Sequence, residues 1–345
     1  MSKKWKIKLA VFMLLFLVFC TACSVESQAA KKKNKNKVSW KLKKGTLTVY
    51  GKGSMKYAIG LKKKQMKKVK KVVIKRGVTT ISNYAFKGMR NLKTVKIAST
   101  VKKIGDECFA KTAIKKLTIP PSVRKIGRDA FYSSKLKNLT LPGDFKYNPE
   151  DYDWAYQVAG NISGNNNLVV TFNTKLKIEN TSLFVAKGYV VSKKDPRYCS
   201  IDGSIYTKDK KTLVRVPMRM KKLKIAESCT EFCLQSVFHG VYGDGALETT
   251  CNVSEIEIPA SVKTIESKRY LQKTRSSGVV PDIKKLIIRT KQLDGRSLAA
   301  LVYDLEVDAK VLMEQLPEQI YYRNGKYFSR DGVWLKPYPR KGECK

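Results

Sequence analysis

The sequence lacks most residues and motifs on which enzymes and metal sites depend. It contains one histidine, His239, in 345 residues. Sites that need several imidazoles are therefore not expected. A phosphate-binding GxxxxGK(S/T) loop, a zinc-protease HExxH motif and a GxSxG nucleophile motif are also absent. We expect no enzymatic activity and no cofactor or metal.

Cysteine offers one weak alternative to this view. Cys229, Cys233, His239 and Cys251 have the spacing C-x3-C-x5-H-x11-C, which matches no standard zinc module. Disulfides among these three cysteines are allowed outside the cell, although their pairing does not follow from the sequence. Cys108 occupies a repeat position that elsewhere holds alanine, and we expect it to be buried.

Acidic residues are scarce and unevenly placed. The chain has 70 Lys and Arg against 28 Asp and Glu, a formal net charge of +42. Residues 27–105 contain 25 basic residues and no acidic one. Lysine contributes 56 of the basic residues, and its hydrated point charge suits diffuse attraction to a polyanion better than the reading of bases.

Long hydrophobic runs are also missing, apart from one near the N-terminus. Leu9–Phe19 is an apolar run of 11 residues after a lysine-rich start, whereas a membrane-spanning helix needs ~20. The pattern predicts a signal peptide over residues 1–22. Thr-Ala-Cys23 resembles the end of a bacterial lipobox, so Cys23 is a candidate for lipidation and membrane anchoring. The alternative is secretion after cleavage at Ala29 or Ala30.

Both alternatives place the mature chain outside the cytoplasm, so nucleic acid is not an expected partner. Residues 23–37 include the run KKKNKNK and are typical of a solvated, Lys-rich tether.

An internal repeat is the strongest positive signal. Apolar-x-apolar triplets begin 23, 22 and 22 residues apart, at Val72, Val95, Leu117 and Leu139. The first three are followed at fixed offsets by two more apolar residues and by a small residue with phenylalanine, as in Ala85-Phe86. One 22-residue unit cannot bury its own apolar stripe, but stacked units can. The repeat therefore predicts a solenoid of stacked short parallel strands with an internal column of phenylalanines.

The phrases Ile119-Pro-Pro-Ser-Val-Arg-Lys-Ile-Gly-Arg-Asp-Ala-Phe131 and Ile258-Pro-Ala-Ser-Val-Lys-Thr-Ile265 resemble the BspA-like leucine-rich repeat family. This resemblance implies an α/β leucine-rich-repeat solenoid and a secreted or surface protein of bacteria. Some members of the family act as adhesins. Asn324-Gly325 between two aromatic runs further predicts a C-terminal hairpin.

The repeat and its interruptions suggest a division of the remaining chain. We expect an N-terminal cap and first repeat block over 38–142, an irregular insertion over 143–190, a hairpin island with a second repeat block over 191–290, and a C-terminal cap over 291–345. The stretch 143–167 groups acidic and aromatic residues, among them Asp144 and Phe145. It is either a packed insertion or a loop that contacts a partner.

Lysines flank the apolar strand residues in successive repeats. We expect them on the open face of the sheet, where neighbouring strands lie ~4.8 Å apart. The candidate ligand-binding residues are Lys71, Lys93, Lys96, Lys115, Lys116 and Lys137. Lys221, Lys222, Lys224, Lys284 and Lys285 are expected to continue the column in the second block.

The function expected from these features is binding or adhesion at the cell surface. The partner would be an extracellular protein, or an anionic glycan or wall polymer. The alternative is a cell-envelope structural protein, held by charge to anionic wall polymer without a specific partner.

Overall fold

The structure is a computed structural model. It describes residues 38–55, 59–146, 167–237, 241–243, 246–249, 252–267, 283–305 and 307–337. The expected signal peptide, the tether and Cys23 lie outside the described residues.

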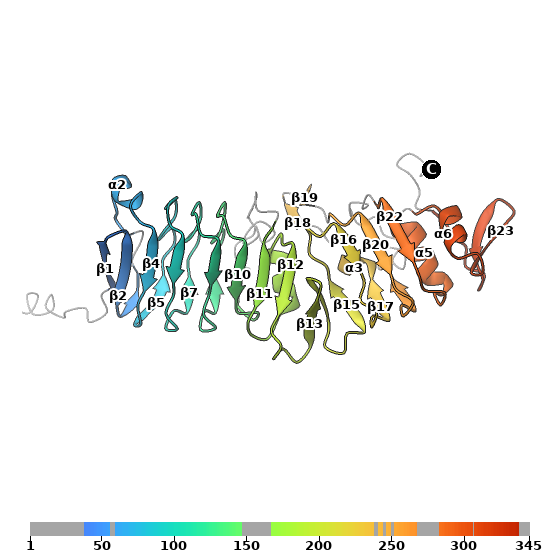
Figure 1. The fold of residues 1–345 in the computed structure, drawn as a ribbon, viewed down its shortest axis with the longest axis horizontal. Coiled ribbons are helices and arrows are strands. Elements are labelled where there is room, and N and C mark those ends of the chain that lie inside the picture. Colours follow the sequence, from blue (N-terminus) through green and yellow to red (C-terminus); the bar gives the residue numbers. More distant parts are fainter. Residues whose placement is uncertain are drawn as a thin grey trace, which may run out of the picture. The chain divides into compact units, whose positions relative to one another are not determined.

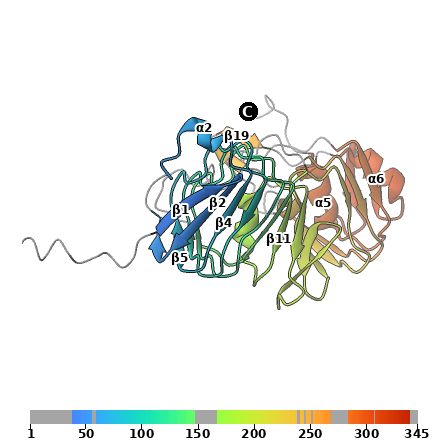
Figure 2. The same cartoon turned by 60° about the vertical axis from the view of Figure 1, so that its left-hand side comes forward.

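The chain begins the described part with a hairpin that opens a mostly parallel sheet (Figure 1). Strands β1 (Val38–Lys43) and β2 (Thr46–Gly51) are antiparallel. β2 then pairs in parallel with β4 (Lys71–Ile74), and β4 pairs with β6 (Thr94–Lys96). Figure 2 shows β1, β2 and β4 side by side. The solenoid of stacked parallel strands predicted from the repeat is confirmed.

The next rungs form a second parallel group. It runs through β8 (Lys116–Thr118), β10 (Asn138–Leu141), β11 (Val169–Phe172) and β12 (Gly188–Val191). The structure therefore differs from the irregular insertion expected over 143–190, because this stretch holds two further rungs. Their strands start 31 and 19 residues after the preceding ones, so a search for a 22-residue period misses them.

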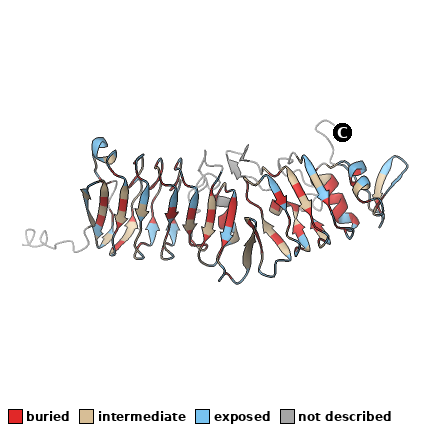
Figure 3. Ribbon diagram, in the orientation of Figure 1, coloured by how far each residue is buried: buried red, intermediate tan, exposed pale blue. Residues whose placement is uncertain are grey.

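Each of the first repeats contributes a second short strand to another sheet, called the shorter-strand sheet below. This sheet contains β3 (Gly53–Ser54), β5 (Val78–Ile81), β7 (Lys103–Ile104) and β9 (Lys125–Ile126). The apolar residues at the later repeat offsets, such as Ile81 and Ile104, pair in register within it and are fully buried. Burial alternates along strands such as β4, β10 and β11, which is the pattern expected when one face of a strand meets the core (Figure 3).

The phenylalanines form the predicted internal column. Phe86, Phe109 and Phe131 are fully buried, and their ring centroids lie 5.5 and 6.2 Å apart along the stack. Backbone bonds support the column, since Phe86 N donates to Cys108 O and Phe109 N donates to Ala130 O. Cys108 is fully buried, as predicted, and burial raises the pKa of its thiol well above the ordinary value.

Tight turns follow the second strands and repeat with the same period. Tyr84, Glu107 and Asp129 have φ values of 59°, 46° and 50° at equivalent positions. Gly127 comes just before such a turn, and a Cβ there would lie 2.5 Å from Asp106 N of the preceding rung. Close approach between rungs therefore requires glycine at this position.

The hairpin island is present where the sequence predicts it. β13 (Tyr198–Ile201) and β14 (Ser204–Thr207) are joined through Asp202-Gly203, both with positive φ. β14 continues antiparallel to β15 (Thr212–Arg215), which begins a parallel series with β17 (Glu231–Cys233) and β21 (Thr264–Glu266). The companion sheet consists of β16 (Lys222–Lys224), β20 (Glu255–Ile258) and β22 (Lys285–Ile288).

Two helices and a final hairpin follow β21 and β22, the last strands of the two parallel sheets. The helices α5 (Gly295–Asp304) and α6 (Ala309–Gln315) begin after Asp294 and Asp308, whose carboxylates accept bonds from backbone N–H groups of the first turn. Ser297 of α5 accepts a bond from Ile265 N. Gln315 of α6 accepts from Ile288 N and donates to Leu286 O. β21 and β22 are the edge strands of their sheets. These side chains form hydrogen bonds with backbone N–H and C=O groups that would otherwise be unpaired at the edge.

The predicted C-terminal hairpin is present as β23 (Ile320–Arg323) and β24 (Lys326–Ser329). The remaining elements are short: α2 (Lys63–Met66), the 3-10 helix η2 (Ile178–Leu183), α3 (Leu234–Val237), and the pair β18 (Val241–Gly243) and β19 (Ala246–Thr249). Within the described ranges, no helix combines the length and hydropathy that a membrane crossing requires.

Candidate binding surface

The six lysines singled out from the sequence lie on the outer side of the first strands. Lys93, Lys96, Lys115, Lys116 and Lys137 are exposed, and Lys71 is half-buried. Their arrangement differs from a simple stack. Lys71 pairs with Thr94 and Thr46, Lys96 pairs with Val73, and Lys116 pairs with Asn138. Lysines within the strands therefore have polar or apolar neighbours rather than one another.

Lysines immediately before the strands do align from rung to rung. Lys93 N donates to Lys70 O at 3.0 Å, and Lys137 N donates to Lys115 O at 2.8 Å. Because β6 and β8 are neighbours, the four residues form one column. We call Lys70, Lys93, Lys115 and Lys137 the pre-strand lysine column. All four are exposed.

A second column, which sequence reasoning missed, lies on the shorter-strand sheet. Lys103 pairs directly with Lys125, and Lys125 pairs with Lys146. We call these three exposed residues the second-sheet lysine column. Side chains at this spacing repel by ~1 kcal/mol per close pair in high dielectric. The available signal was a lysine directly before each buried isoleucine, Ile104 and Ile126, spaced one repeat apart.

The acidic residues near these columns are engaged elsewhere. Asp106 bonds Asn83 and the Arg128 backbone N–H, and Glu107 forms an ion pair with Lys87. Among the residues that the structure describes, none forms an ion pair with the seven lysines of the two columns. Their charge is therefore uncompensated at short range.

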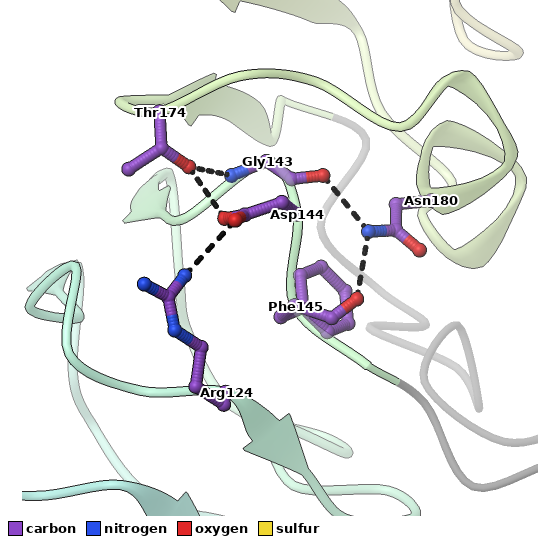
Figure 4. Close-up of polar contacts among 6 residues, drawn as sticks. All are labelled: Arg124, Gly143, Asp144, Phe145, Thr174 and Asn180. Atoms are coloured by element: carbon purple, nitrogen blue, oxygen red, sulfur yellow. Dashed lines mark hydrogen bonds and ion pairs between the residues drawn. The ribbon is translucent and has the colours of Figure 1, made fainter.

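Arg124 shows the contrasting arrangement, with a fixed acidic partner (Figure 4). Its guanidinium donates to Asp144 at 2.9 Å, and Asp144 also accepts a bond from the Thr174 hydroxyl. Asn180 Nδ2 donates to the carbonyls of Gly143 and Phe145, and Phe145 itself is 1% exposed. Asp144 and Phe145 are thus parts of the packed structure. The remaining acidic and aromatic residues of the stretch 143–167 lie outside the described residues.

The second repeat block corrects the expectation that the lysine column continues. Lys222 pairs in register with Glu255, which pairs with Lys285. Lys224 pairs with Glu257. Lys222 Nζ lies 2.9 Å from a Glu255 carboxylate oxygen, and Glu257 forms an ion pair with Arg289 at 2.7 Å. Alternating charges offset one another here, so uncompensated positive charge on paired strands is a feature of the first repeats.

Cysteine chemistry finds little support in the described part of the chain. Cys229 is buried, donates to Glu231 O, and has a thiol pKa raised chiefly by burial. Cys233 donates to Gln235, while His239 and Cys251 lie outside the described residues. In the described ranges, no group of three or more His, Cys, Asp or Glu side chains could hold a metal ion.

The fold can be compared with known proteins. Residues 62–152 match the model of the BspA type leucine rich repeat region. A leucine-rich repeat protein from Eubacterium ventriosum is 19% identical with a TM-score of 0.37, over 74% of this chain and 71% of that one. The pneumococcal vaccine antigen PcpA is 15% identical with a TM-score of 0.33, over 76% and 70%.

A leucine rich cell surface protein from Faecalibacterium prausnitzii is 14% identical with a TM-score of 0.27, over 74% and 76% of the two chains. A search of curated proteins found no match. The matched residues 62–152 include β4 to β10 and all seven lysines of the two columns. Residues 62–152 are therefore similar to a BspA type leucine rich repeat region.

Proposed function

We propose that this chain is an exported leucine-rich-repeat protein of the bacterial cell surface, and that its first repeats bind an anionic polymer. The observation that supports the proposal is the pair of uncompensated lysine columns on residues 70–146. A polyanion along either column would relieve the repulsion between lysines on neighbouring rungs. Envelope polymers and acidic host glycans or proteins are the polyanions that an exported chain would meet.

A second function has a specific observation in its favour. Most of the positive charge is lysine, and lysine columns carry no planar or bidentate geometry. Such a surface also suits an envelope structural protein that is held by charge without a specific partner. Two measurable properties separate these functions. One is whether binding to a polyanion depends on which lysines are replaced, and the other is whether that binding persists at high salt.

The test compares two variants that lose the same charge. The first changes Lys93, Lys96, Lys115, Lys116 and Lys137 to Gln. The matched control changes the five second-block lysines to Gln: Lys221, Lys222, Lys224, Lys284 and Lys285, all exposed. The measurement is the salt concentration at which each protein elutes from an immobilised anionic polysaccharide.

We expect the first variant to elute at clearly lower salt than the wild type, and the control to elute close to the wild type. Equal shifts in both variants, with all binding lost by ~0.3 M salt, would favour the structural alternative, because screening there is strong. Unchanged elution of the first variant would contradict a role for the pre-strand lysine column.

A further inference from the structure

Three aromatic side chains lie in one row across the C-terminal hairpin. Tyr321 of β23 pairs with Phe328 of β24, and Phe328 pairs with Trp334 through an isolated bridge. Residues directly opposite one another in paired strands project from the same face. With strands ~4.8 Å apart, the row spans about 10 Å, which is room for more than one sugar ring. We call these three residues the aromatic row.

The row is open to solvent, which is unusual for large apolar side chains. Tyr321 is 42% and Trp334 is 40% exposed, and Phe328 is half-buried. The opposite face of the hairpin is anchored at its Ile320–Ser329 end, where these residues are 4% and 1% exposed, whereas Tyr322 nearer the turn on that face is 58% exposed. The aromatic row is therefore the outward face. Contiguous exposed apolar surface of this kind commonly marks an interaction site.

Cations accompany the row. Lys326 and Lys336 lie over the Trp334 ring, with Nζ at 4.5 and 5.3 Å from the centroid. Arg323 pairs with Lys326 at the turn. Within the part of the chain that the structure describes, none of the three forms an ion pair. The surface thus combines ring area with free positive charge.

This combination restricts the chemistry of a partner. Aromatic rings contact the apolar C–H groups of a sugar, and ammonium and guanidinium groups bind its carboxylates. A single-stranded nucleic acid would instead stack flat bases on open ring faces. Here the Tyr321 and Phe328 rings lie 18° from parallel at 5.6 Å, and lysines already lie over the indole. The stacked neighbour and the lysines leave only part of each ring face exposed. Two or three C–H groups of a sugar can contact such a partial face, whereas a flat base needs a whole face to stack on.

We infer that the outward face of the C-terminal hairpin, built from Tyr321, Phe328 and Trp334 with Lys326 and Lys336, is a binding site for an acidic saccharide. This site does not depend on the lysine columns of the first repeats. It would recognise the sugar ring and its carboxylate together, whereas the columns supply charge alone.

The experiment measures affinities of the full chain by isothermal titration calorimetry with four probes. Oligogalacturonate offers rings and carboxylates, and its methyl ester offers rings without charge. Polyphosphate offers charge without rings, and a single-stranded oligothymidylate offers bases and phosphates. We expect the tightest binding for oligogalacturonate.

Two tyrosine-to-alanine variants remove a ring from opposite faces of the hairpin. Tyr321→Ala removes a ring of the row, and Tyr322→Ala removes the neighbouring ring, 58% exposed, from the opposite face. We expect Tyr321→Ala to weaken oligogalacturonate binding about tenfold and to leave polyphosphate binding unchanged. Tyr322→Ala should retain wild-type affinity. Tyr321→Phe keeps the ring and should bind normally, which shows that a loss in Tyr321→Ala reflects the missing ring.

The inference is overturned by tighter binding of oligothymidylate, by equal losses in Tyr321→Ala and Tyr322→Ala, or by no binding of oligogalacturonate. The five-lysine variant of the first repeats should still bind oligogalacturonate. If that variant loses this binding while Tyr321→Ala does not, the saccharide lies on the lysine columns. The proposed function would then stand and the hairpin site would not.

Discussion

The phenylalanine column should make the stability of the solenoid depend on position within the stack. Phe109 stacks on both Phe86 and Phe131, whereas Phe131 has one stacked phenylalanine partner among the described residues. All three side chains are fully buried. Replacing Phe109 or Phe131 by leucine therefore removes similar apolar area but a different number of ring contacts.

The magnitude follows from these contacts. The change in shape costs up to about 1.5 kcal/mol at either position. Each lost ring pair adds about 0.5–1.5 kcal/mol. We expect Phe109→Leu to lower the free energy of unfolding by about 2–4 kcal/mol, and Phe131→Leu by about 0.5–1.5 kcal/mol less than that.

Urea unfolding followed by circular dichroism measures this difference, provided that the m-value stays constant between variants. A double variant tests the coupling, because Phe109 and Phe131 are in contact and their effects should not add. Equal losses at the two positions, or a larger loss for Phe131→Leu, would refute the argument. Rung-to-rung ring contacts would then contribute nothing beyond buried area.

Two further predictions concern close approach between rungs and the charge of one turn residue. Gly127→Ala should destabilise the fold by about 1–3 kcal/mol, because its Cβ would meet backbone atoms at 2.5 and 2.6 Å. Gly188→Ala, whose nearest contact would be 3.6 Å, should stay within about 1 kcal/mol of the wild type in the same urea assay, and the reverse order would contradict the steric reasoning. The pKa of Asp129 is raised to about 6, first by burial and then by Glu107. Its ionisation therefore opposes folding as pH rises from about 4 to 6, so Asp129→Asn should be more stable than the wild type at pH 7 by about 1 kcal/mol, after allowance for partial exposure. Thermal unfolding should show the stability difference between Asp129→Asn and the wild type disappearing below pH 4. A difference that does not change with pH would rule out ionisation of the Asp129 carboxylate as its source.

Charge distribution links the fold to the proposed function. The acid-free stretch 27–105 supplies the first lysines of both columns, Lys70 and Lys103. In the second block, Glu255 lies between Lys222 and Lys285, and Glu257 pairs with Lys224. A net charge of +42 is thus spread over surfaces that differ in their ability to attract a polyanion.

Some features of the site were readable from the sequence because they recur at a fixed period. The 22-residue spacing places Phe86, Phe109 and Phe131 in one column. The same spacing identified exposed lysines beside the strands. The period alone did not give the register between neighbouring strands. The triplet Thr94–Lys96, for example, does not reveal which residue of the next strand lies opposite Lys96.

The sequence by itself determined the repeat, the buried faces of its strands, the two predicted hairpins and the excess of lysine. These depend on local spacing, which a chain carries without reference to its partners. Only the tertiary structure decided that two rungs continue through 143–190, that Lys103, Lys125 and Lys146 align, and that glutamates interrupt the second block. These neighbours are determined by pairing between strands that lie 19 to 33 residues apart in the sequence. Such pairing depends on the conformations of connecting loops of unequal length, which local spacing does not specify.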